Sequence, residues 1–478
     1  MSVTASKAAL RERFVGKTLH EVPTPSIILD LAKLEVNCQR MIDAADKNGI
    51  GWRAHIKTHK TKELTRLQVG EDSKAPANII VSTVLEAEEI APVLKEFQSK
   101  GRKVNVLYAF PIFPSAVPRL AAISKDLGSD TVSVMIDNPD QVPLLAALKS
   151  QSGGNKPLAF LKIDVNYHRA GAIPGTPTYQ SLLKTILASE AEGSCVLHGL
   201  YAHAGQSYYT RKDWDALMYL TDEFVTLSNV AKEIRGQSPS HELVLSVGAT
   251  PTATALQHPE FLTGAPAAAV SAPPTNEAAG ARVASLSALI KDLKRDGLGL
   301  EVHAGVYPTL DLQQLATHAR DGSLLGSGDI AITVVAEVAS LYAGRGEGGS
   351  TEALVNAGSL ALGREPCKED GAGHYAGWGV VAPWGDAAGL DKSDPAPRDF
   401  PAVHGGWQVG KISQEHGVLV WQGAREAEVP LRFGQRVRIW PNHACIAGAG
   451  YDHYLVVDSR RTGKEDEVVD VWPRWNGW

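Results

Sequence analysis

Cysteine is scarce in this chain of 478 residues, which holds only Cys38, Cys195, Cys367 and Cys445. They lie far apart and form no CxxC pair, so a disulfide framework is excluded. Such cysteine usage is typical of a reducing compartment, where each thiol belongs to the core or binds a metal ion. We therefore expect a cytoplasmic protein.

Long apolar runs and an excess of positive charge are also missing. No run approaches the roughly 20 apolar residues that a membrane-spanning helix needs, and the amino terminus lacks the apolar segment of a secretory signal. Lys and Arg number 47 against 53 Asp and Glu, a net charge of −6. That balance argues against a nucleic-acid-binding or membrane-binding surface. With 44% hydrophobic residues, the sequence is that of a globular protein long enough for two domains.

The first part of the chain alternates between short apolar runs and helical patterns. Eight runs are expected to form strands: Trp52–Lys57, Asn78–Val81, Val104–Leu107, Val132–Ile136, Leu158–Asp164, Val196–Ala202, Leu243–Val247 and Gly299–His303. Eight strands separated by helices over about 280 residues are typical of a (β/α)₈ TIM barrel. A doubly wound open sheet is the competing interpretation, but its dinucleotide-binding form is weakened by the lack of a GxGxxG motif after the first strand.

After roughly residue 325 the pattern changes to short β-branched segments separated by glycine-rich turns, which predicts an all-β domain. We therefore expect an amino-terminal arm associated with the β-domain over residues 1–24, an α/β barrel over 25–325 and the β-domain over 326–478. Arg345–Ser350 is expected to be a hairpin loop. The Ala- and Pro-rich stretch Gly264–Gly280 is interpreted as a surface insertion without assigned chemistry.

The stretch Gly51–Lys60 places basic side chains on one face of a predicted strand. Read with a period of two, Arg53, His55 and Lys57 point one way, away from Trp52, Ala54 and Ile56. Burying cations costs several kcal/mol each unless an anion meets them. The stretch is therefore either a basic edge strand with a solvated face, or a strand that holds Lys57 at the carboxyl end of a barrel. A partly desolvated lysine near other cations becomes a nucleophile toward carbonyl groups.

Polar residues also follow other predicted barrel strands, at the end where barrels build their active sites. They are Arg169 beside Gly171, His203 and Tyr208, the turn Gly248–Ala249–Thr250, and His303 with Tyr307. The glycine and hydroxyl of that turn suit a phosphate held by backbone N–H groups at a helix start. Taken alone, a histidine at a strand end is more often a structural residue, and such a turn is more often an ordinary turn. Their common position indicates a site.

In the predicted β-domain, His443 and Cys445 are expected to alternate on an extended segment, so that both side chains reach one face. Imidazole and thiolate are ligands that zinc prefers. Two ligands are too few for a structural zinc but compatible with an open catalytic site. The alternative is a purely structural pair.

Five motifs carry a resemblance to a known family. They are Arg53–His59, His203–Tyr208, Glu301–Tyr307, Ser413–His416 and Pro441–Cys445, spread in this order over nearly the whole chain. Together they resemble the fold-type III pyridoxal-phosphate enzymes, the alanine-racemase-like barrels, and among these the D-serine dehydratase and metal-dependent D-threonine aldolase family. The resemblance implies that the first strand, around Ile27, joins the β-domain. It also implies a homodimer.

The resemblance further implies site residues. Lys57 would form a Schiff base with pyridoxal 5′-phosphate, His203 would lie against the cofactor ring, and Arg169 would approach its phenolic oxygen. The cofactor, mainly its phosphate, would be held by Tyr208, Gly248, Ala249 and Thr250, with Tyr307 nearby. His303 stands where racemases place an arginine facing the pyridine nitrogen. His443 and Cys445 would bind Zn²⁺.

The activity implied is the conversion of a small D-amino acid, D-serine, to pyruvate and ammonia, with D-threonine as a second substrate. The aldolases carry Asp at the second metal position, so Cys445 favours the dehydratase. The nearest alternative is the D-threonine aldolase. A non-catalytic cofactor carrier would lack the β-domain. A metal-dependent barrel hydrolase using His55, Lys57 and His59 is the interpretation that ignores the resemblance.

Overall fold

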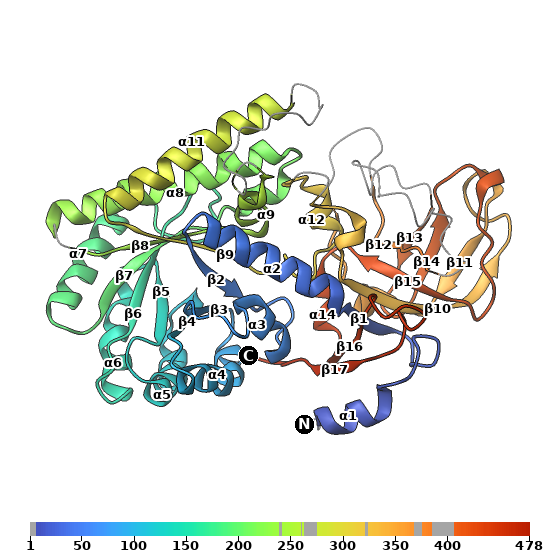
Figure 1. Cartoon of the computed structure of the whole chain (residues 1–478), viewed down its shortest axis with the longest axis horizontal. Coiled ribbons are helices and arrows are strands. Elements are labelled where there is room, and N and C mark those ends of the chain that lie inside the picture. The colour runs from blue at the N-terminus through green and yellow to red at the C-terminus, as the bar shows by residue number, and fades with distance from the viewer. Residues whose placement is uncertain are drawn as a thin grey trace. The chain divides into compact units, whose positions relative to one another are not determined.

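The computed structural model describes residues 6–238, 241–259, 261, 275–320, 324–367, 375–384 and 406–478. Contacts divide the chain into two compact units, coloured by chain position in Figure 1. One, here called the barrel unit, comprises Gln39–Ser207, Lys212–Gly305 and Gly477–Trp478. The other, the sheet unit, comprises Met1–Cys38, Tyr208–Arg211 and Val306–Asn476. The chain passes from one unit to the other at several points, among them after residues 38 and 305. The predicted domain ranges, with the barrel over 25–325, stay a prediction.

The barrel unit contains a closed barrel of parallel strands in sequence order, from β2 to β9. The strands are β2 (Gly51–His55), β3 (Ala77–Val81), β4 (Val104–Pro111), β5 (Val132–Ile136), β6 (Leu158–Lys162), β7 (Val196–Tyr201), β8 (Val244–Val247) and β9 (Gly299–Ala304). Each predicted run forms one of these strands, with β4 running further than expected. The predicted fold class is confirmed.

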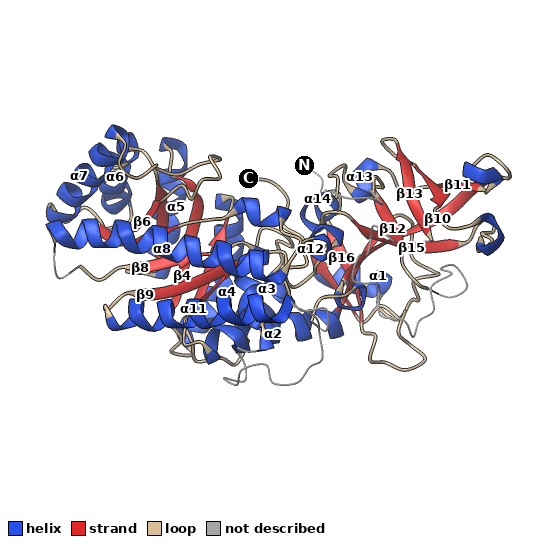
Figure 2. Ribbon diagram, turned by 90° about the horizontal axis from the view of Figure 1, so that it is seen from above, coloured by secondary structure: helices blue, strands red, loops and turns tan. Residues whose placement is uncertain are grey.

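Helices surround the strands of this unit, as Figure 2 shows. They are α3 (Lys62–Val69), α4 (Val84–Ser99), α5 (Val117–Leu127), α6 (Pro143–Gln151), α7 (Pro177–Ala191), α8 (Asp213–Gln237), α9 (Thr250–Thr254) and α11 (Thr275–Arg295), with short 3₁₀ turns η1 (Pro114–Ala116), η2 (Pro139–Gln141) and η4 (Ala255–Gln257). Threonine caps start several of them; Thr61, Thr83 and Thr176 each accept a backbone N–H in the first turn.

The sheet unit is built on a nine-stranded sheet in the order β11-β14-β13-β12-β15-β10-β1-β16-β17. Its strands are β1 (Ser26–Asp30), β10 (Ile332–Tyr342), β11 (Glu352–Val355), β12 (Gly379–Val381), β13 (Trp407–Ile412), β14 (Gly417–Trp421), β15 (Arg436–Pro441), β16 (His453–Val457) and β17 (Asp470–Pro473). β1 pairs antiparallel with β10 and parallel with β16. The prediction that the strand around Ile27 joins the β-domain is confirmed.

Short helices complete the sheet unit: α1 (Lys7–Phe14), α12 (Leu312–Ala316), α13 (Ser359–Leu362) and α14 (Ala444–Ala449), with 3₁₀ turns η5 (Ser327–Asp329), η6 (Glu347–Gly349) and η7 (Arg425–Ala427). The 17-residue helix α2 (Leu31–Lys47) crosses the division between the units. The predicted hairpin loop Arg345–Ser350 does join the antiparallel strands β10 and β11.

Two further expectations concern the insertion at residues 264–280 and membrane-spanning helices. Of the predicted insertion Gly264–Gly280, residues 264–274 lie outside the described residues, and the remainder begins helix α11. None of the helices that the structure describes is long and apolar enough to cross a membrane.

Candidate active site

Lys57 lies in a turn that follows the carboxyl end of β2, with its side chain exposed between buried Ile56 and Thr58. Its backbone N–H donates to His55 Nδ1 at 3.4 Å. β2 pairs with β3 on one side and β9 on the other, so the basic edge strand considered from the sequence is wrong. The structure therefore places a solvent-accessible lysine at the carboxyl end of a central barrel strand, where barrel enzymes place catalytic groups.

The two histidines that flank Lys57 differ. His55 is half-buried, and burial together with the charge of Lys57 holds its pKa well below the usual value. His59 is buried with both ring nitrogens engaged, because Thr61 N–H donates to Nδ1 at 3.1 Å and Nε2 lies 2.9 Å from Gln68 Oε1. His59 is thus a structural residue that fixes the turn. That argues against the hydrolase interpretation, which needs it as a metal ligand.

Inside the barrel, below this turn, Arg53 is only 1% exposed. Its Nε donates to Glu301 Oε1 at 2.6 Å and its Nη1 donates to Asn105 Oδ1 at 2.7 Å. Glu301 is the anion that a buried arginine requires, and it lies 248 residues away in the sequence. Ser133 completes this interior network, because its hydroxyl donates to Asn105 Oδ1 at 2.9 Å.

His303 stands two residues after Glu301 on β9 and is buried. Its Nδ1 lies 3.1 Å from Ser246 Oγ, and the Ser246 hydroxyl donates to Glu301 Oε1 at 2.8 Å. The imidazole stacks on the Tyr201 ring, with centroids 4.2 Å apart. Burial and the nearby His203 and Arg53 hold the pKa of His303 well below its usual value, so the ring is neutral.

His203 follows β7, and its ring is nearly parallel to that of His303, with centroids 6.5 Å apart. Its Nδ1 donates to the Gly248 carbonyl at 2.8 Å, and because a carbonyl can only accept, this bond places the proton on Nδ1. Burial, Arg169 and Lys57 lower the pKa of His203 to about 3. His203 is therefore a neutral imidazole that presents an unprotonated Nε2.

The turn Gly248–Ala249–Thr250 connects β8 to α9. Gly248 has a φ of +142°, and a side-chain carbon there would lie 2.3 Å from the His303 carbonyl oxygen, so only glycine fits. Its N–H donates to Glu223 Oε1 and the Ala249 N–H donates to Thr252 Oγ1. A phosphate at this turn would therefore be met by Thr250 and the first N–H groups of α9 rather than by the two residues before it.

Glu223 of α8 holds two strand ends together. Its Oε1 accepts the Ala204 N–H at 2.8 Å and the Gly248 N–H at 3.2 Å. Burial raises the pKa of this carboxyl to about 7, and the two N–H groups oppose that rise. Because Ala204 is adjacent to His203, Glu223 fixes the backbone on both sides of the His203–Gly248 hydrogen bond.

Arg169 is exposed on a loop after β6 and lies 5.4 Å from the Tyr167 ring. Asp164 shapes the loop by accepting the N–H groups of Tyr167 and His168 at 3.1 and 3.0 Å. Burial, Arg169 and Lys57 all lower the pKa of Lys162 at the end of β6. Three cationic side chains thus influence one another at this end of the barrel, an arrangement suited to an anionic ligand.

The other residues predicted for the site belong to the sheet unit. Tyr208 is half-buried in the 3₁₀ turn η3 (Gly205–Tyr209). Tyr307 is buried, and its hydroxyl lies beside the Cys38 thiol, whose pKa is raised by burial. The structure therefore brings Lys57, His203, His303 and the Gly248–Thr250 turn together at the ends of the barrel strands. The sheet unit contains the remaining predicted residues, Tyr208, Tyr307, His443 and Cys445.

His443 and Cys445 do not alternate on an extended segment, so that prediction is wrong. β15 ends at Pro441, His443 is the N-cap of α14, and Cys445 lies within that helix. Both side chains are half-buried. Among the described residues, no group of three or more His, Cys, Asp and Glu side chains is arranged to hold a metal ion. The metal role of the pair stays a prediction.

Two buried residues fix this strand-to-helix junction. Asn442 donates to the Glu365 and Gly377 carbonyls at 3.0 and 2.8 Å and accepts the Tyr375 hydroxyl at 2.9 Å. Asp311 accepts the Ala444 N–H at 2.8 Å; burial raises the pKa of its carboxyl, and the nearby His443 opposes that rise. Orientation of a metal ligand by a neighbouring carboxylate is common in metal sites. Asp311, Glu301, Ser246 and Glu223 were not identified from the sequence.

Comparison with known proteins agrees with the fold and with the motifs. The profile of the "Putative serine dehydratase domain" family matches residues 331–457. The chain is 35% identical to the D-serine dehydratase of Schizosaccharomyces pombe over all of this chain and 97% of that protein. It is 29% identical to the D-serine dehydratase of Saccharomyces cerevisiae over 98% of this chain and 99% of that protein.

A solved structure extends the likeness to three dimensions. D-threo-3-hydroxyaspartate dehydratase from Delftia sp. HT23 superposes with a TM-score of 0.69 at 26% identity, covering 97% of this chain and all of that one. A variant of that enzyme was solved in a metal-free form. The 35% identity to the Schizosaccharomyces pombe enzyme covers all of this chain and nearly all of that enzyme. It establishes that this chain belongs to the D-serine dehydratase family.

Proposed function

We propose that this protein is a pyridoxal-5′-phosphate- and zinc-dependent D-serine dehydratase, a lyase that converts D-serine to pyruvate and ammonia and also accepts D-threonine. The observation that carries the proposal is the 35% identity to a D-serine dehydratase over the entire chain. The barrel end supports it, because Lys57 stands there with two neutral imidazoles, His203 and His303.

The residues at the barrel end fit this cofactor. Within the described chain, the buried Nε2 of His303 has no hydrogen-bond partner, which suits contact with a polar group of a ligand. The cations Lys57, Lys162 and Arg169 suit a phosphorylated ligand. Pyridoxal 5′-phosphate, when bound, supplies an electron sink for a carbanion at the substrate Cα.

Each residue then has a role. Lys57 Nζ would hold the cofactor, and its amine would be the base that takes the Cα proton of the substrate. His203 would hold the cofactor ring, and Arg169 would hold its phenolic oxygen. The phosphate would be met by Thr250 and the first N–H groups of α9, because the N–H groups of Gly248 and Ala249 are already engaged. The cofactor contacts of Gly248, Ala249, Tyr208 and Tyr307 stay predictions from the resemblance.

For the metal, His443 and Cys445 offer one imidazole and one thiolate, the donor chemistry that zinc prefers. Zn²⁺, when bound, supplies a Lewis acid for the departing β-hydroxyl group. The metal-free form of the Delftia relative supports a metal in this family of folds. Asn442 and Asp311 would keep the two ligands oriented.

The proposal also includes a homodimer in a reducing cytoplasmic compartment. The compartment is supported by four cysteines that are present as thiols. The molar mass of the purified protein in solution tests the dimer, and a mass of about one chain would contradict it.

The central experiment is an assay of the purified protein for products from D-serine. We expect pyruvate and ammonia, together with a visible absorbance from the bound cofactor. D-threonine and D-threo-3-hydroxyaspartate serve as competing substrates. The aldolase alternative predicts glycine and acetaldehyde from D-threonine, and that outcome, without pyruvate from D-serine, would replace the proposed function.

Chelation separates the two cofactors. Removal of the metal should abolish D-serine turnover while the visible absorbance persists, and added Zn²⁺ should restore turnover. Full activity after complete removal of zinc would contradict the metal role of His443 and Cys445.

A further inference from the structure

Three side chains of the barrel interior form a directed chain of hydrogen bonds that ends at His303. Arg53 Nε donates to Glu301 Oε1 at 2.6 Å, the Ser246 hydroxyl donates to the same oxygen at 2.8 Å, and Ser246 Oγ lies 3.1 Å from His303 Nδ1. Glu301 Oε2 also accepts the Asn78 side chain at 3.2 Å. Every group around Glu301 is thus a donor.

The direction of each bond follows from the chemistry of the groups. A carboxylate paired with a guanidinium is ionised and can only accept, so the single Ser246 hydroxyl proton is committed to Glu301. Ser246 Oγ then has only lone pairs to offer His303. The 3.1 Å contact therefore requires the proton of the neutral imidazole to lie on Nδ1, which leaves Nε2 with a lone pair.

We propose that the Glu301–Ser246 relay fixes His303 in the Nδ1–H tautomer and makes its Nε2 an obligate hydrogen-bond acceptor. Glu301 and Ser246 are then positioning residues that act through His303. A second step, which rests on the proposed function, concerns the protonation of the cofactor's pyridine nitrogen. A buried acceptor is satisfied only by a donor, so a cofactor held with its pyridine nitrogen against His303 Nε2 would have to carry a proton on that nitrogen.

The surroundings of the ring agree with a neutral imidazole. Tyr201 stacks on one face at 4.2 Å, and His203 lies further along the same stack at 6.5 Å. Burial is the largest cause of the low pKa of His303, and the nearby His203, Arg53 and Lys162 lower this pKa further. A second proton on His303 is therefore opposed from several directions.

One group competes with this assignment. The Gly248 carbonyl lies near the ring and pulls the pKa of His303 upward. It would accept a proton from His303 Nε2 if the tautomer were reversed. However, this carbonyl already accepts His203 Nδ1–H at 2.8 Å, and it forms no hydrogen bond to His303 Nε2 in the described chain. The tautomer of His303 decides between the two arrangements.

The first test measures that tautomer in the cofactor-free protein by ¹⁵N NMR with ¹⁵N-labelled histidine, assigning His303 from the signals lost in His303→Gln. We expect a protonated Nδ1 and a bare Nε2. Ser246→Ala should abolish the preference for one tautomer. Ser133→Ala is the matched control, because Ser133 is equally buried in the barrel and donates to Asn105 rather than contacting His303. A protonated Nε2 in the wild type, or an unchanged tautomer in Ser246→Ala, overturns the relay.

The double variant Arg53→Met/Glu301→Leu provides a reversal that does not depend on Ser246→Ala. It removes the carboxylate that accepts the Ser246 hydroxyl without leaving Arg53 unpaired, so this hydroxyl can donate to His303 Nδ1 instead. The ¹⁵N shifts of the two ring nitrogens should then exchange. Glu301→Gln should keep the wild-type pattern, because its carbonyl oxygen can still accept from both Arg53 and Ser246. Retention of the wild-type pattern in the double variant overturns the role of Glu301.

The second test reconstitutes the protein with cofactor labelled with ¹⁵N in the pyridine ring. We expect a protonated ring nitrogen in the wild type, in Ser133→Ala and in Glu301→Gln, and a shift toward the unprotonated form in Ser246→Ala and in Arg53→Met/Glu301→Leu. An unprotonated nitrogen in the wild type overturns the inference about the cofactor. If the protein binds no cofactor, the proposed function fails, and the first test still decides the tautomer of His303.

Discussion

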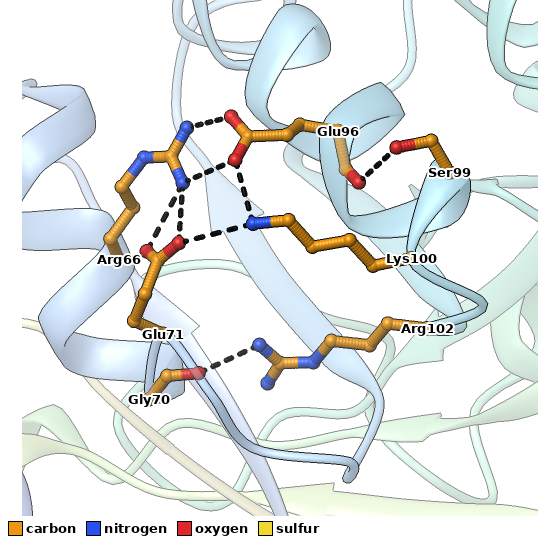
Figure 3. Close-up of polar contacts among 7 residues, drawn as sticks. All are labelled: Arg66, Gly70, Glu71, Glu96, Ser99, Lys100 and Arg102. Atoms are coloured by element: carbon orange, nitrogen blue, oxygen red, sulfur yellow. Dashed lines mark hydrogen bonds and ion pairs between the residues drawn. The ribbon is translucent and has the colours of Figure 1, made fainter.

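Two networks of Arg and Glu side chains in the barrel unit have the same chemistry and opposite surroundings. In the interior network, Arg53, Glu301, Asn105, Ser133 and Ser246 are all buried. The outer network, drawn in Figure 3, joins Arg66 to Glu71 and Glu96, and Lys100 to the same two carboxylates. Its side chains are between 24% and 56% exposed.

The contrast shows what burial adds to an ion pair. The outer pairs share several interchangeable partners, are screened by salt, and contribute little to stability. The interior groups have fixed partners, because any unpaired member would be a buried charge or an unsatisfied polar atom. Fixed partners give each proton one direction, which the outer network cannot do.

The largest effect is expected at Lys57, whose side chain is exposed although the proposed activity depends on it. Lys57→Ala should lower D-serine turnover by roughly 10³-fold or more and remove the visible absorbance, because Lys57 Nζ is the atom that would carry the cofactor. Its urea midpoint should stay near that of the wild type, since Lys57 is exposed. Lys100→Ala, which removes a 56% exposed lysine of the outer network, is the control and should keep full turnover. A Lys57→Ala protein that keeps the absorbance would refute the assignment.

Glu301→Ala comes next and leaves Arg53 buried without its anion. We expect a loss of about 3–5 kcal/mol in the free energy of unfolding, the usual cost of breaking one side of a buried pair. The double variant Arg53→Met/Glu301→Leu removes both charges and should recover much of that loss. Urea unfolding monitored by circular dichroism measures both. A single variant as stable as the wild type would show that the interior network behaves like the outer one.

Glu223 is a buried carboxyl whose hydrogen-bond partners are backbone N–H groups rather than a guanidinium. Burial raises its pKa from 4.5 to about 7, so between these values the folded protein holds a proton that the unfolded chain has released. Stability should therefore fall as pH rises through this window. Glu223→Gln is neutral throughout, and its urea midpoint relative to the wild type should rise from pH 5 to pH 8. A constant difference would place the Glu223 pKa outside the window.

The smallest effect is expected at the outer network. Glu96→Gln removes a carboxylate that contacts Arg66 and Lys100. Because the group is solvated, its urea midpoint should differ little from that of the wild type at low salt, and not at all at high salt. A large loss that persists in high salt would remove the distinction between the two networks.

Most of the barrel was predictable because its signal is local. Each strand from β2 to β9 is a short apolar run, and alternation placed Arg53, His55 and Lys57 on one face before any partner was known. The cost of burying Arg53 also required an anion. The identity of that anion was not predictable, because Glu301 is 248 residues from Arg53 in the sequence and contacts it only in the closed barrel.

His443 and Cys445 show where the prediction from local sequence was wrong. The segment from Pro441 to Cys445 has no pattern that separates an extended strand from a helix start, and the sequence prediction chose the strand. Asn442 and Asp311 decide otherwise by fixing the backbone around His443 with hydrogen bonds to distant residues. Such partners are invisible in a single sequence, as were Ser246 and Glu223.

The place of β1 between β10 and β16 has a consequence for synthesis on the ribosome. The five residues Ser26–Asp30 emerge first, yet their two neighbours in the sheet begin at Ile332 and His453. β1 can therefore pair with both neighbours only after almost the whole polypeptide has been synthesised. The strands of the barrel are all synthesised before β10 and β16, so the barrel can fold before β1 is paired. A fragment starting at residue 306 would lack this inner strand. A peptide spanning residues 6–38, supplied separately, should restore its folding.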